Sequence, residues 1–362
     1  MKYIDDAEKR IERHKAFWEG EVIDRPVVTI LGMNNNAIVH PGFSMLPPAS
    51  SEMFKWYTDA EWRLKNFRLA CDNSTWVGDR LPMVFLNLGA AGHAGFFKGM
   101  KNVFSDAGLI FENELDEDNP SLEFDENSIW YKKTLEMAQY LVDESNGDYL
   151  VSQSDCCGNA DVLAAVKGTD SLLMDMILGA DYIKPAMDKI QKAYERIHKE
   201  VYDIVRDNNN GASGIGWLHT YAPGLSAQIQ SDICCMISPE LFEKYIVPEL
   251  EAQCEMLDYP LYHLDGQEVV RHLDHLLSVE KLKAIQWTRV DGQPSPVEFI
   301  DVMKKIQAAG KSLLVLFDTI EEVDILTQNL SSKGLHLHTN FAAMSDDDAN
   351  EIIKVVERNT HD

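Results

Sequence analysis

Short apolar runs alternate with amphipathic helical stretches along most of the chain. The runs PVVTIL at 26–31, MVFLNL at 83–88 and SLLVLF at 312–317 are bounded by proline, glycine or polar residues, as buried strands commonly are. Between such runs, apolar residues recur at helical spacing, most clearly over 184–208. This alternation predicts parallel strands joined by helical crossovers.

About eight strand–helix units are expected, and no glycine fingerprint of a dinucleotide-binding fold accompanies them. We therefore predict an α/β fold of the (β/α)8 TIM barrel type. A helical extension over 1–25 precedes the barrel at 26–362, with an irregular, acidic insertion near 90–126, and the whole chain 1–362 is expected to form one domain. The remaining strands are expected at 149–154, 212–219, 225–230, 260–264, 282–287 and 334–338.

Acidic residues outnumber basic ones, with 59 Asp and Glu against 33 Lys and Arg and a net charge of −26. Such a field repels polyanions, which disfavours nucleic acid and anionic membranes as partners. The longest apolar run has about six residues, far below the roughly 20 that cross a bilayer. The N-terminal MKYIDDAEKR lacks the apolar core of a signal peptide, and the six cysteines form no CxxC pair. A cytoplasmic protein with reduced thiols is therefore expected.

Polar and aromatic residues follow the predicted strands, where barrel enzymes build their sites. The catalytic candidates are His219, Asp232, His263 and Asp265, and the substrate-binding candidates are Asn87, Asp155, Trp217, Tyr221 and Trp287. An aspartate at a strand end is also a common helix N-cap, so each carboxylate has a structural alternative. The aromatic residues at 217 and 221 suit either a wall for a small organic substrate or plain packing inside the barrel.

The segment YHLDGQEVVRHLDH at 262–275 contains the strongest candidate pair. Residues i and i+2 of a strand share a face, so His263 and Asp265 are expected to point together into the barrel mouth. Tyr262 and Leu264 are then expected to face the surrounding helices. The strand end therefore supplies one imidazole and one carboxylate to a shared site.

The rest of this segment is expected to form a helix over 268–278 with one buried stripe. The apolar positions of that stripe are Val269, Val270, Leu273, Leu276 and Leu277. His275 lies nearly opposite the stripe and His272 at its edge, so both are expected at the solvated surface of the helix.

Two chemistries fit the pair His263 and Asp265. A carboxylate beside a histidine can orient the imidazole for acid–base work, and the same two groups can bind a metal ion. Zinc prefers three or four ligands, so Cys234, a nearby thiol, completes a tentative metal set with the pair. Cys234 and Cys235 are alternatively two small buried hydrophobic residues.

Three segments resemble the uroporphyrinogen decarboxylase superfamily, which also contains cobalamin-linked methyltransferases acting on small methylated compounds. They are RHKAFWEGEVIDRPVV near the N-terminus, SDICCMISPELFEKYIVPEL at 231–250, and YHLDGQEVVRHLDHLLSVEKLKAIQW from 262, which is similar to an uncharacterised branch. The resemblance covers most of the chain. It implies a (β/α)8 barrel and makes a homodimer an expectation.

The chain departs from both characterised activities of that superfamily. The decarboxylases carry an arginine motif after the first strand, but VVTILGMNNNAIVH has no arginine to hold substrate carboxylates. The methyltransferases show His-x-Cys and a later cysteine as zinc ligands, whereas this strand reads His263-Leu264-Asp265 and no cysteine follows Cys254. We expect either a harder His/Asp metal site, with zinc as a candidate, or catalysis without a metal.

The leading hypothesis is a barrel enzyme that acts by methyl transfer on a small molecule that is not heavily anionic, with a corrinoid protein as a candidate partner. One alternative is a decarboxylase (a lyase) acting on uroporphyrinogen or a smaller acid. A second is a sugar-cleaving barrel that uses two of the strand-end aspartates. A third is a barrel that binds a small molecule without catalysis.

Overall fold

The computed structural model describes residues 1–32, 53–87, 89, 92–105, 108–113, 122–290, 292–339 and 344–361. Six parallel strands form its main sheet in the order β1-β10-β9-β8-β7-β6. Their bounds are Val27–Thr29 (β1), Ser226–Ile229 (β6), Tyr259–Asp265 (β7), Ala284–Thr288 (β8), Ser312–Phe317 (β9) and Leu335–Thr339 (β10). A second parallel pair joins β2 (Met83–Leu86) to β5 (Leu150–Ser154). The predicted α/β class with a parallel sheet is confirmed.

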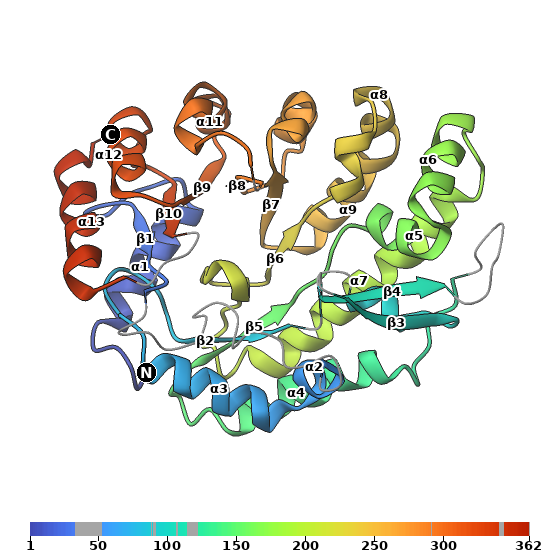
Figure 1. Ribbon diagram of the computed structural model, residues 1–362, viewed down its shortest axis with the longest axis horizontal. Helices are drawn as coiled ribbons and strands as arrows, with labels where there is room; N and C mark the ends of the chain where they lie inside the picture. Colours follow the sequence, from blue (N-terminus) through green and yellow to red (C-terminus); the bar gives the residue numbers. More distant parts are fainter. Residues whose placement is uncertain are drawn as a thin grey trace.

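Helices follow most of the strands and lie at the periphery of the molecule (Figure 1). The α-helices are α1 (Ala7–Trp18), α2 (Met53–Thr58), α3 (Ala60–Asp72), α4 (Ile129–Asp143), α5 (Asn159–Lys167), α6 (Thr169–Leu178), α7 (Ile183–Val205), α8 (Pro239–Leu241), α9 (Val247–Met256), α10 (Leu273–Ser278), α11 (Ile300–Ala308), α12 (Ile320–Asn329) and α13 (Asp346–Asn359). The 3-10 helices are η2 (Gly92–Phe96), η3 (Gly216–Leu218), η4 (Asp232–Met236), η6 (Gln267–His272) and η7 (Pro296–Phe299), and η5 (Phe242–Ile246) is a π-helix. Among the helices described, none combines the length and the apolar composition that crossing a bilayer requires.

Two sequence-based predictions of local structure were wrong. The region expected to be irregular near 90–126 contains an antiparallel hairpin of β3 (Met100–Ser105) and β4 (Gly108–Asn113). The acidic residues around the hairpin made the short alternation of apolar and polar positions along β4 hard to recognise in the sequence. This alternation buries Phe111, which packs on Trp130. The strand expected over 212–219 is instead a turn that includes η3. In this turn a Cβ at Gly214 would lie 2.1 Å from the Thr220 carbonyl oxygen, so the segment folds back closely on itself.

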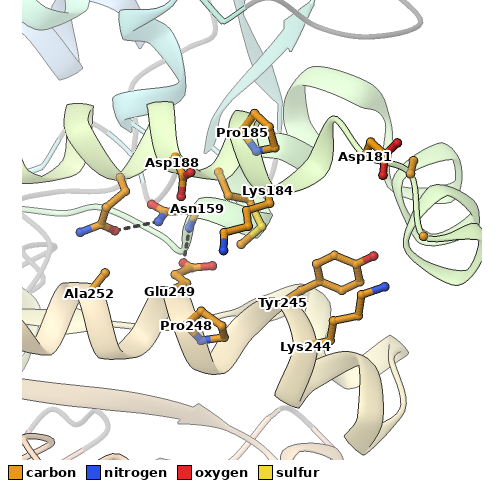
Figure 2. Close-up of a pocket in the computed structure, with 14 residues that line it drawn as sticks. Asn159, Asp181, Lys184, Pro185, Asp188, Lys244, Tyr245, Pro248, Glu249 and Ala252 are labelled. Atoms are coloured by element: carbon orange, nitrogen blue, oxygen red, sulfur yellow. Dashed lines mark hydrogen bonds between the residues drawn. The ribbon is translucent and has the colours of Figure 1, made fainter.

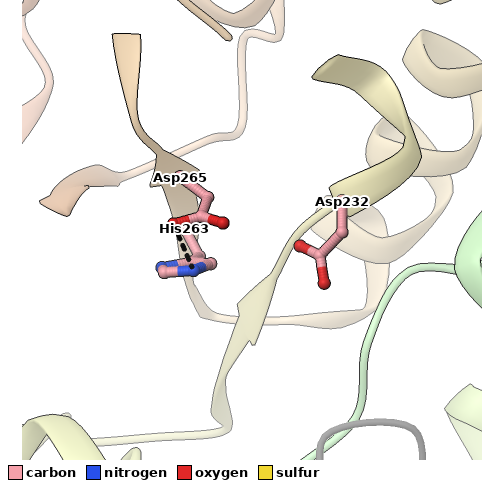
Figure 3. A group of neighbouring side chains, drawn as sticks. All are labelled: Asp232, His263 and Asp265. Carbon is pink, nitrogen blue, oxygen red and sulfur yellow. Dashed lines mark ion pairs between the residues drawn. The ribbon is translucent and has the colours of Figure 1, made fainter. Parts of the chain in front are cut away.

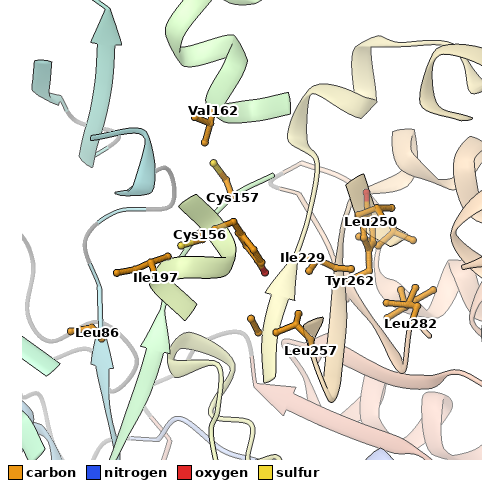
Figure 4. Close-up of a cluster of buried hydrophobic side chains, with 14 of the residues drawn as sticks. Leu86, Cys156, Cys157, Val162, Ile197, Ile229, Leu250, Leu257, Tyr262 and Leu282 are labelled. Atoms are coloured by element: carbon orange, nitrogen blue, oxygen red, sulfur yellow. The ribbon is translucent and has the colours of Figure 1, made fainter. Parts of the chain in front are cut away.

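Alternate residues of each main strand pack into two different cores. On β9, Leu313, Val315 and Phe317 pack outward against the helices, whereas Leu314 and Leu316 belong to a smaller inner cluster. Figure 4 shows part of the outer core, where side chains of β6, β7 and the neighbouring helices meet. Each fully buried aliphatic side chain of this kind contributes about 1.5–3 kcal/mol relative to exposure. Both faces of the main sheet are therefore buried, as a parallel sheet requires.

The inward face changes from apolar to polar along the strands. Leu261 on β7 and Ala284 on β8 lie in the inner cluster, together with residues of α1. Two positions later, His263 and Gln286 are register partners across the same two strands. Because parallel strands end at one edge of a sheet, the polar ends of β6, β7 and β8 meet there. The inward face therefore carries an apolar cluster near the start of the strands and a polar site at their carboxyl ends.

A buried ion-pair network holds α1 across the amino ends of the strands. The carboxylate of Asp79 has no exposed area and accepts hydrogen bonds from Arg13 at 2.8 Å, from Arg25 and from the Val28 amide at 2.9 Å. Burial alone would raise the pKa of Asp79, but the two guanidinium groups and the amide lower it below its usual range. Arg25 thus forms a buried structural ion pair with Asp79 and is not available to bind a substrate.

Four buried histidines lie together beside this network. The ring centroids of His14 and His336 are 5.4 Å apart, those of His336 and His338 are 6.1 Å apart, and His219 stacks on His338 at 6.2 Å. Burial lowers the pKa of each of the four, to about 4 for His338. All four are therefore neutral in the folded protein near neutral pH.

These histidines predict a loss of stability in mild acid. Below pH about 6.5 the unfolded chain takes up protons that the buried rings do not, so the unfolding free energy falls by up to about 1.4 kcal/mol per pH unit for each ring. The contribution of His338 is present above pH about 6.5 and is lost as the pH falls towards about 4. His338→Asn keeps a donor for the Thr339 carbonyl but removes the titration. Urea unfolding at a series of pH values should show a shallower acid slope for the variant, and equal slopes would contradict the prediction.

Candidate functional site

The pair predicted at the end of β7 faces a second carboxylate. His263 Nε2 lies 3.8 Å from Asp265 Oδ1, and Asp232, the first residue of η4, points at both from the end of β6 (Figure 3). One potential ligand atom of each of the three residues lies within 4.8 Å of the others. The His263 side chain is 13 % exposed and that of Asp265 is 42 % exposed, so solvent reaches the group. We call Asp232, His263 and Asp265 the triad.

Gln286 on β8 orients the imidazole of the triad. His263 Nδ1 contacts Gln286 Oε1, and the amide nitrogen of Gln286 contacts the hydroxyl of Thr288. This orientation of the amide presents its carbonyl to Nδ1, so Nδ1 donates to Gln286 and Nε2 is the ring nitrogen that faces Asp265. The sequence left two roles open for Asp265, orienting the imidazole or joining it on a metal. Gln286 contacts Nδ1, the ring nitrogen away from Asp265, so Asp265 faces Nε2 and both of its roles concern that nitrogen.

Two glutamines on β6 connect the triad to Asp155 at the end of β5. Gln228 Nε2 donates to Asp155 Oδ1 at 2.9 Å and to Gln230 Oε1 at 2.6 Å. Gln230 Nε2 in turn donates to both Asp232 oxygens at 3.1 Å. The indole nitrogen of Trp217 donates a hydrogen bond to Gln228 Oε1, the side-chain carbonyl oxygen. In this position the Trp217 ring lies edge-on to His263, with ring centroids 5.3 Å apart. The amide groups of this row order the carboxylates on either side of it.

The site carries more negative than positive charge. Burial raises the pKa of Asp155 to about 6, with His263 lowering it and Asp232 raising it further. Desolvation also raises the pKa of Asp232, which His263 lowers and Asp265 raises. These carboxylates share one imidazole, so a cation bound among them would relieve their repulsion.

Asp161 on α5 supports the triad from behind. Its carboxylate accepts hydrogen bonds from the backbone amides of Asp232 at 3.0 Å, Ile233 at 2.9 Å and Gly158 at 3.2 Å. Burial raises the pKa of Asp161 to about 7, as does Asp232, although the three amides lower it. Asp161 therefore fixes the turn that presents Asp232. No sequence motif marks it, because the contact joins α5 to η4.

Several predicted site residues lie away from the triad. Asn87 Oδ1 accepts a hydrogen bond from the backbone amide of Gly89, after β2. Trp287 packs outward on Phe299, with ring centroids 4.7 Å apart. Tyr221 packs in a buried cluster with residues of α1, and His219 lies in the histidine cluster already described. Of the predicted residues, the triad, Asp155 and Trp217 are the ones that the structure brings together.

Two predictions about the neighbourhood of the pair were wrong. Cys234 does not face His263: it is fully buried in the outer core, with its sulfur 3.8 Å from the Tyr262 hydroxyl. His272 is not at the surface either. It is fully buried, stacks on Phe242 with ring centroids 4.3 Å apart and contacts the Cys234 carbonyl at 2.9 Å. The predicted stripe itself is largely confirmed, since Val269, Leu273 and Leu276 are buried. His272 joins them because η6 turns about 120° per residue rather than 100°.

Replacing Gln286 is predicted to change the tautomer of His263. In Gln286→Leu, Nδ1 loses its acceptor, so the Nδ1–H form should give way to a mixture of both tautomers. Nitrogen NMR of isotope-labelled histidine, with the His263 signal identified by its loss in His263→Gln, measures this directly. Gln267→Leu, an exposed change just after β7, is the matched control. An unchanged spectrum in Gln286→Leu would contradict the assigned role.

Replacing Asp161 is predicted to loosen η4 without unfolding the protein. In Asp161→Ala, the amides of Asp232 and Ile233 lose their acceptor and should exchange with solvent about tenfold faster. Hydrogen-exchange mass spectrometry of the peptide spanning η4 checks this result. Asp170→Ala, an exposed aspartate in the first turn of α6, should leave that peptide unchanged.

The chain was compared with known proteins at the level of sequence and of structure. No model of a known protein family matches it, and no curated protein matches its sequence. Among solved structures, a methyltransferase from Methanosarcina mazei is similar, with a TM-score of 0.60 over 96% of this chain and 98% of that chain. The two sequences are 12% identical, so the similarity concerns the fold. The chain thus shares the α/β architecture of a methyltransferase over almost its whole length.

Proposed function

We propose that this protein is a metal-dependent methyltransferase for a small molecule, with its site at the carboxyl ends of β5 to β8. The observation that carries the proposal is the convergence of Asp232, His263 and Asp265 within 4.8 Å. The structural likeness to a methyltransferase and the sequence resemblance to the uroporphyrinogen decarboxylase superfamily supply the reaction class. Fold likeness alone is weak support for a reaction, so the site residues carry the greater part of the argument.

The donor set of the triad fits a divalent cation. One imidazole nitrogen with two carboxylates suits zinc, manganese or iron(II), and the absence of a thiolate disfavours a zinc–sulfur site. Gln286 holds Nδ1 of His263 and leaves Nε2 for the metal, which is the usual second contact of a ligating histidine. A bound divalent ion would act as a Lewis acid towards the group that receives the methyl.

The residues around the triad then have defined roles. Asp161 holds the turn of Asp232, and the amides of Gln228 and Gln230 order the carboxylates. The edge of Trp217 lies beside His263 and gives the site an apolar wall. Asp155, with a pKa of about 6, is able to take a proton near neutral pH.

The reaction proposed is nucleophilic methyl transfer. A methylated corrinoid, carried by a partner protein, would pass its methyl to a sulfur or nitrogen of the small molecule. The corrinoid would supply the methyl group and keep the electron pair of the broken cobalt–carbon bond, and a carboxylate such as Asp155 would take the proton that the nucleophile loses when it forms its bond to the methyl carbon. The corrinoid partner and a homodimer remain predictions of the sequence resemblance.

We also propose that the two parallel sheets belong to one (β/α)8 barrel in a single domain. The eight strands that would form it are β1, β2, β5, β6, β7, β8, β9 and β10. Support comes from contacts across both gaps: the Gln153 amide of β5 donates to the Gly214 carbonyl at 3.0 Å, and Thr29 of β1 bridges to Gly78 before β2. An inner apolar cluster closed by α1 is also what a barrel interior requires.

The alternative of a decarboxylase for polyacids receives less support. The arginines that follow β7 and β8 are Arg271, which donates to the Cys235 carbonyl, and Arg289, which pairs with Asp318. No lysine or arginine occurs in the parts of the sequence outside the described residues. A porphyrinogen with many carboxylates would meet an acidic site here. The sugar-cleaving and non-catalytic alternatives both predict that the following test shows no methyl transfer.

Metal binding and methyl transfer are predicted to fail together when the triad is changed. Protein equilibrated with Zn2+ or Mn2+ and then dialysed should keep about one equivalent by elemental analysis. His263→Gln, Asp232→Asn and Asp265→Asn should each weaken metal binding by at least about tenfold and slow methyl transfer between methylcobalamin and small thiols or amines, followed by cobalamin absorbance. Cys234→Ser is the control and should bind metal normally. Retention of less than about a tenth of an equivalent would rule out the metal version.

A further inference from the structure

A cavity lies between α7 and α9, away from the triad. Its volume is about 480 Å³, within the range of small-molecule sites. Figure 2 shows Lys184 and Pro185 on α7 facing Pro248 and Glu249 on α9. We call this cavity, which also reaches Asn159 at the start of α5, the α7–α9 cleft. It shares none of its lining residues with the triad or with the row of glutamines.

The floor of the cleft offers one acceptor atom that lacks a donor among the described residues. Asn159 is 1% exposed; its amide nitrogen donates to Gln191 at 2.8 Å, but its buried Oδ1 has no hydrogen-bond partner in the described part of the chain. Next to it, the Glu249 carboxylate accepts the Asn159 and Ala160 backbone amides. Burial raises the pKa of Glu249 to about 8, and the neighbouring Asp161 adds to the shift. An unpartnered buried acceptor in such surroundings costs stability unless a ligand or water donates to it.

The rim of the cleft is exposed and carries both signs of charge. Lys184 and Asp188 lie one turn apart on α7, and neither forms an ion pair within the described part of the chain. Lys244 at the other end packs over the Tyr245 ring, 4.7 Å from its centroid. Pro185, Met187, Pro248 and Ala252 supply apolar walls between these charges. A ligand that matches this lining has a cationic group with several hydrogen-bond donors, an anionic group and a short apolar portion.

We propose that the α7–α9 cleft binds a small aliphatic α-amino acid as its zwitterion, with the ammonium at Asn159 Oδ1 and Asp188 and the carboxylate at Lys184. The ammonium supplies donors to Asn159 Oδ1 and to the Asp188 carboxylate. The carboxylate gives Lys184 a counter-charge that the described residues do not provide, and the aliphatic side chain covers the proline and methionine walls. The site is separate from the triad and does not depend on the proposed methyl transfer.

Titration calorimetry of the full chain with leucine, isoleucine, valine and methionine tests the proposal. At least one of them should bind with a dissociation constant below about 10 mM. Isocaproate, which is leucine without its ammonium, and isoamylamine, which is leucine without its carboxylate, should each bind at least about fivefold more weakly. If no amino acid binds, or if either half-ligand binds as tightly as leucine, the proposal is overturned.

Exposed variants locate the binding site. Lys184→Gln and Asp188→Asn should each weaken binding of the amino acid about fivefold, and Lys184→Gln should leave isoamylamine binding unchanged. Lys192→Gln, on the same helix but outside the cleft, is the matched control. Thermal unfolding of all three variants should match that of the parent, since these side chains are exposed. Binding that is insensitive to both cleft variants would place the ligand elsewhere and overturn the assignment.

Discussion

The crowding of carboxylates behind and around the ends of β5, β6 and β7 is the constraint on which this site depends. Asp155, Asp161, Asp232 and Glu249 all have raised pKa values, each chiefly through desolvation, and a neighbouring carboxylate adds to the shift of each. The fold compensates with dipoles rather than with arginine or lysine. The amides at the start of α5 and at η4 and the side chains of Gln228 and Gln230 supply the donors. A site arranged in this way stays acidic and is suited to a cation.

The start of α5 links the triad to the α7–α9 cleft. Asp161 within this helix holds the turn of Asp232, while Glu249 reaches the first amides of the same helix from α9. Gly158 makes this arrangement possible, since a Cβ at that position would meet the Gln230 carbonyl at 2.2 Å. A shift of the start of α5 would therefore change the contacts of Asp161 with η4 and those of Glu249 with the first amides of the helix, so this segment connects the triad to the α7–α9 cleft.

Much of the fold and the centre of the site could be predicted from local pattern, but the supporting residues could not. The i, i+2 rule correctly put His263 and Asp265 on one face and sent Tyr262 to the outer core. On β8 the predicted residue was Trp287, yet the inward position belongs to Gln286, one residue earlier. An aromatic residue at a strand end suits either face, and only pairing with β7 decides which face it takes. The prediction that His272 lies at the surface was wrong because no sequence pattern indicated that its helix begins as a 3-10 helix.

By itself the sequence determined the α/β class, the strand positions of β7 to β10 and the presence of an imidazole and a carboxylate at one strand end. These features follow from alternation within single segments, which must bury one face whatever their neighbours are. The tertiary structure decided that Asp232 rather than Cys234 joins the pair, that Gln286 sets the tautomer and that Asp161 supports the turn. Each of these contacts joins segments far apart in the chain, so it depends on strand register and helix packing, which no local pattern encodes.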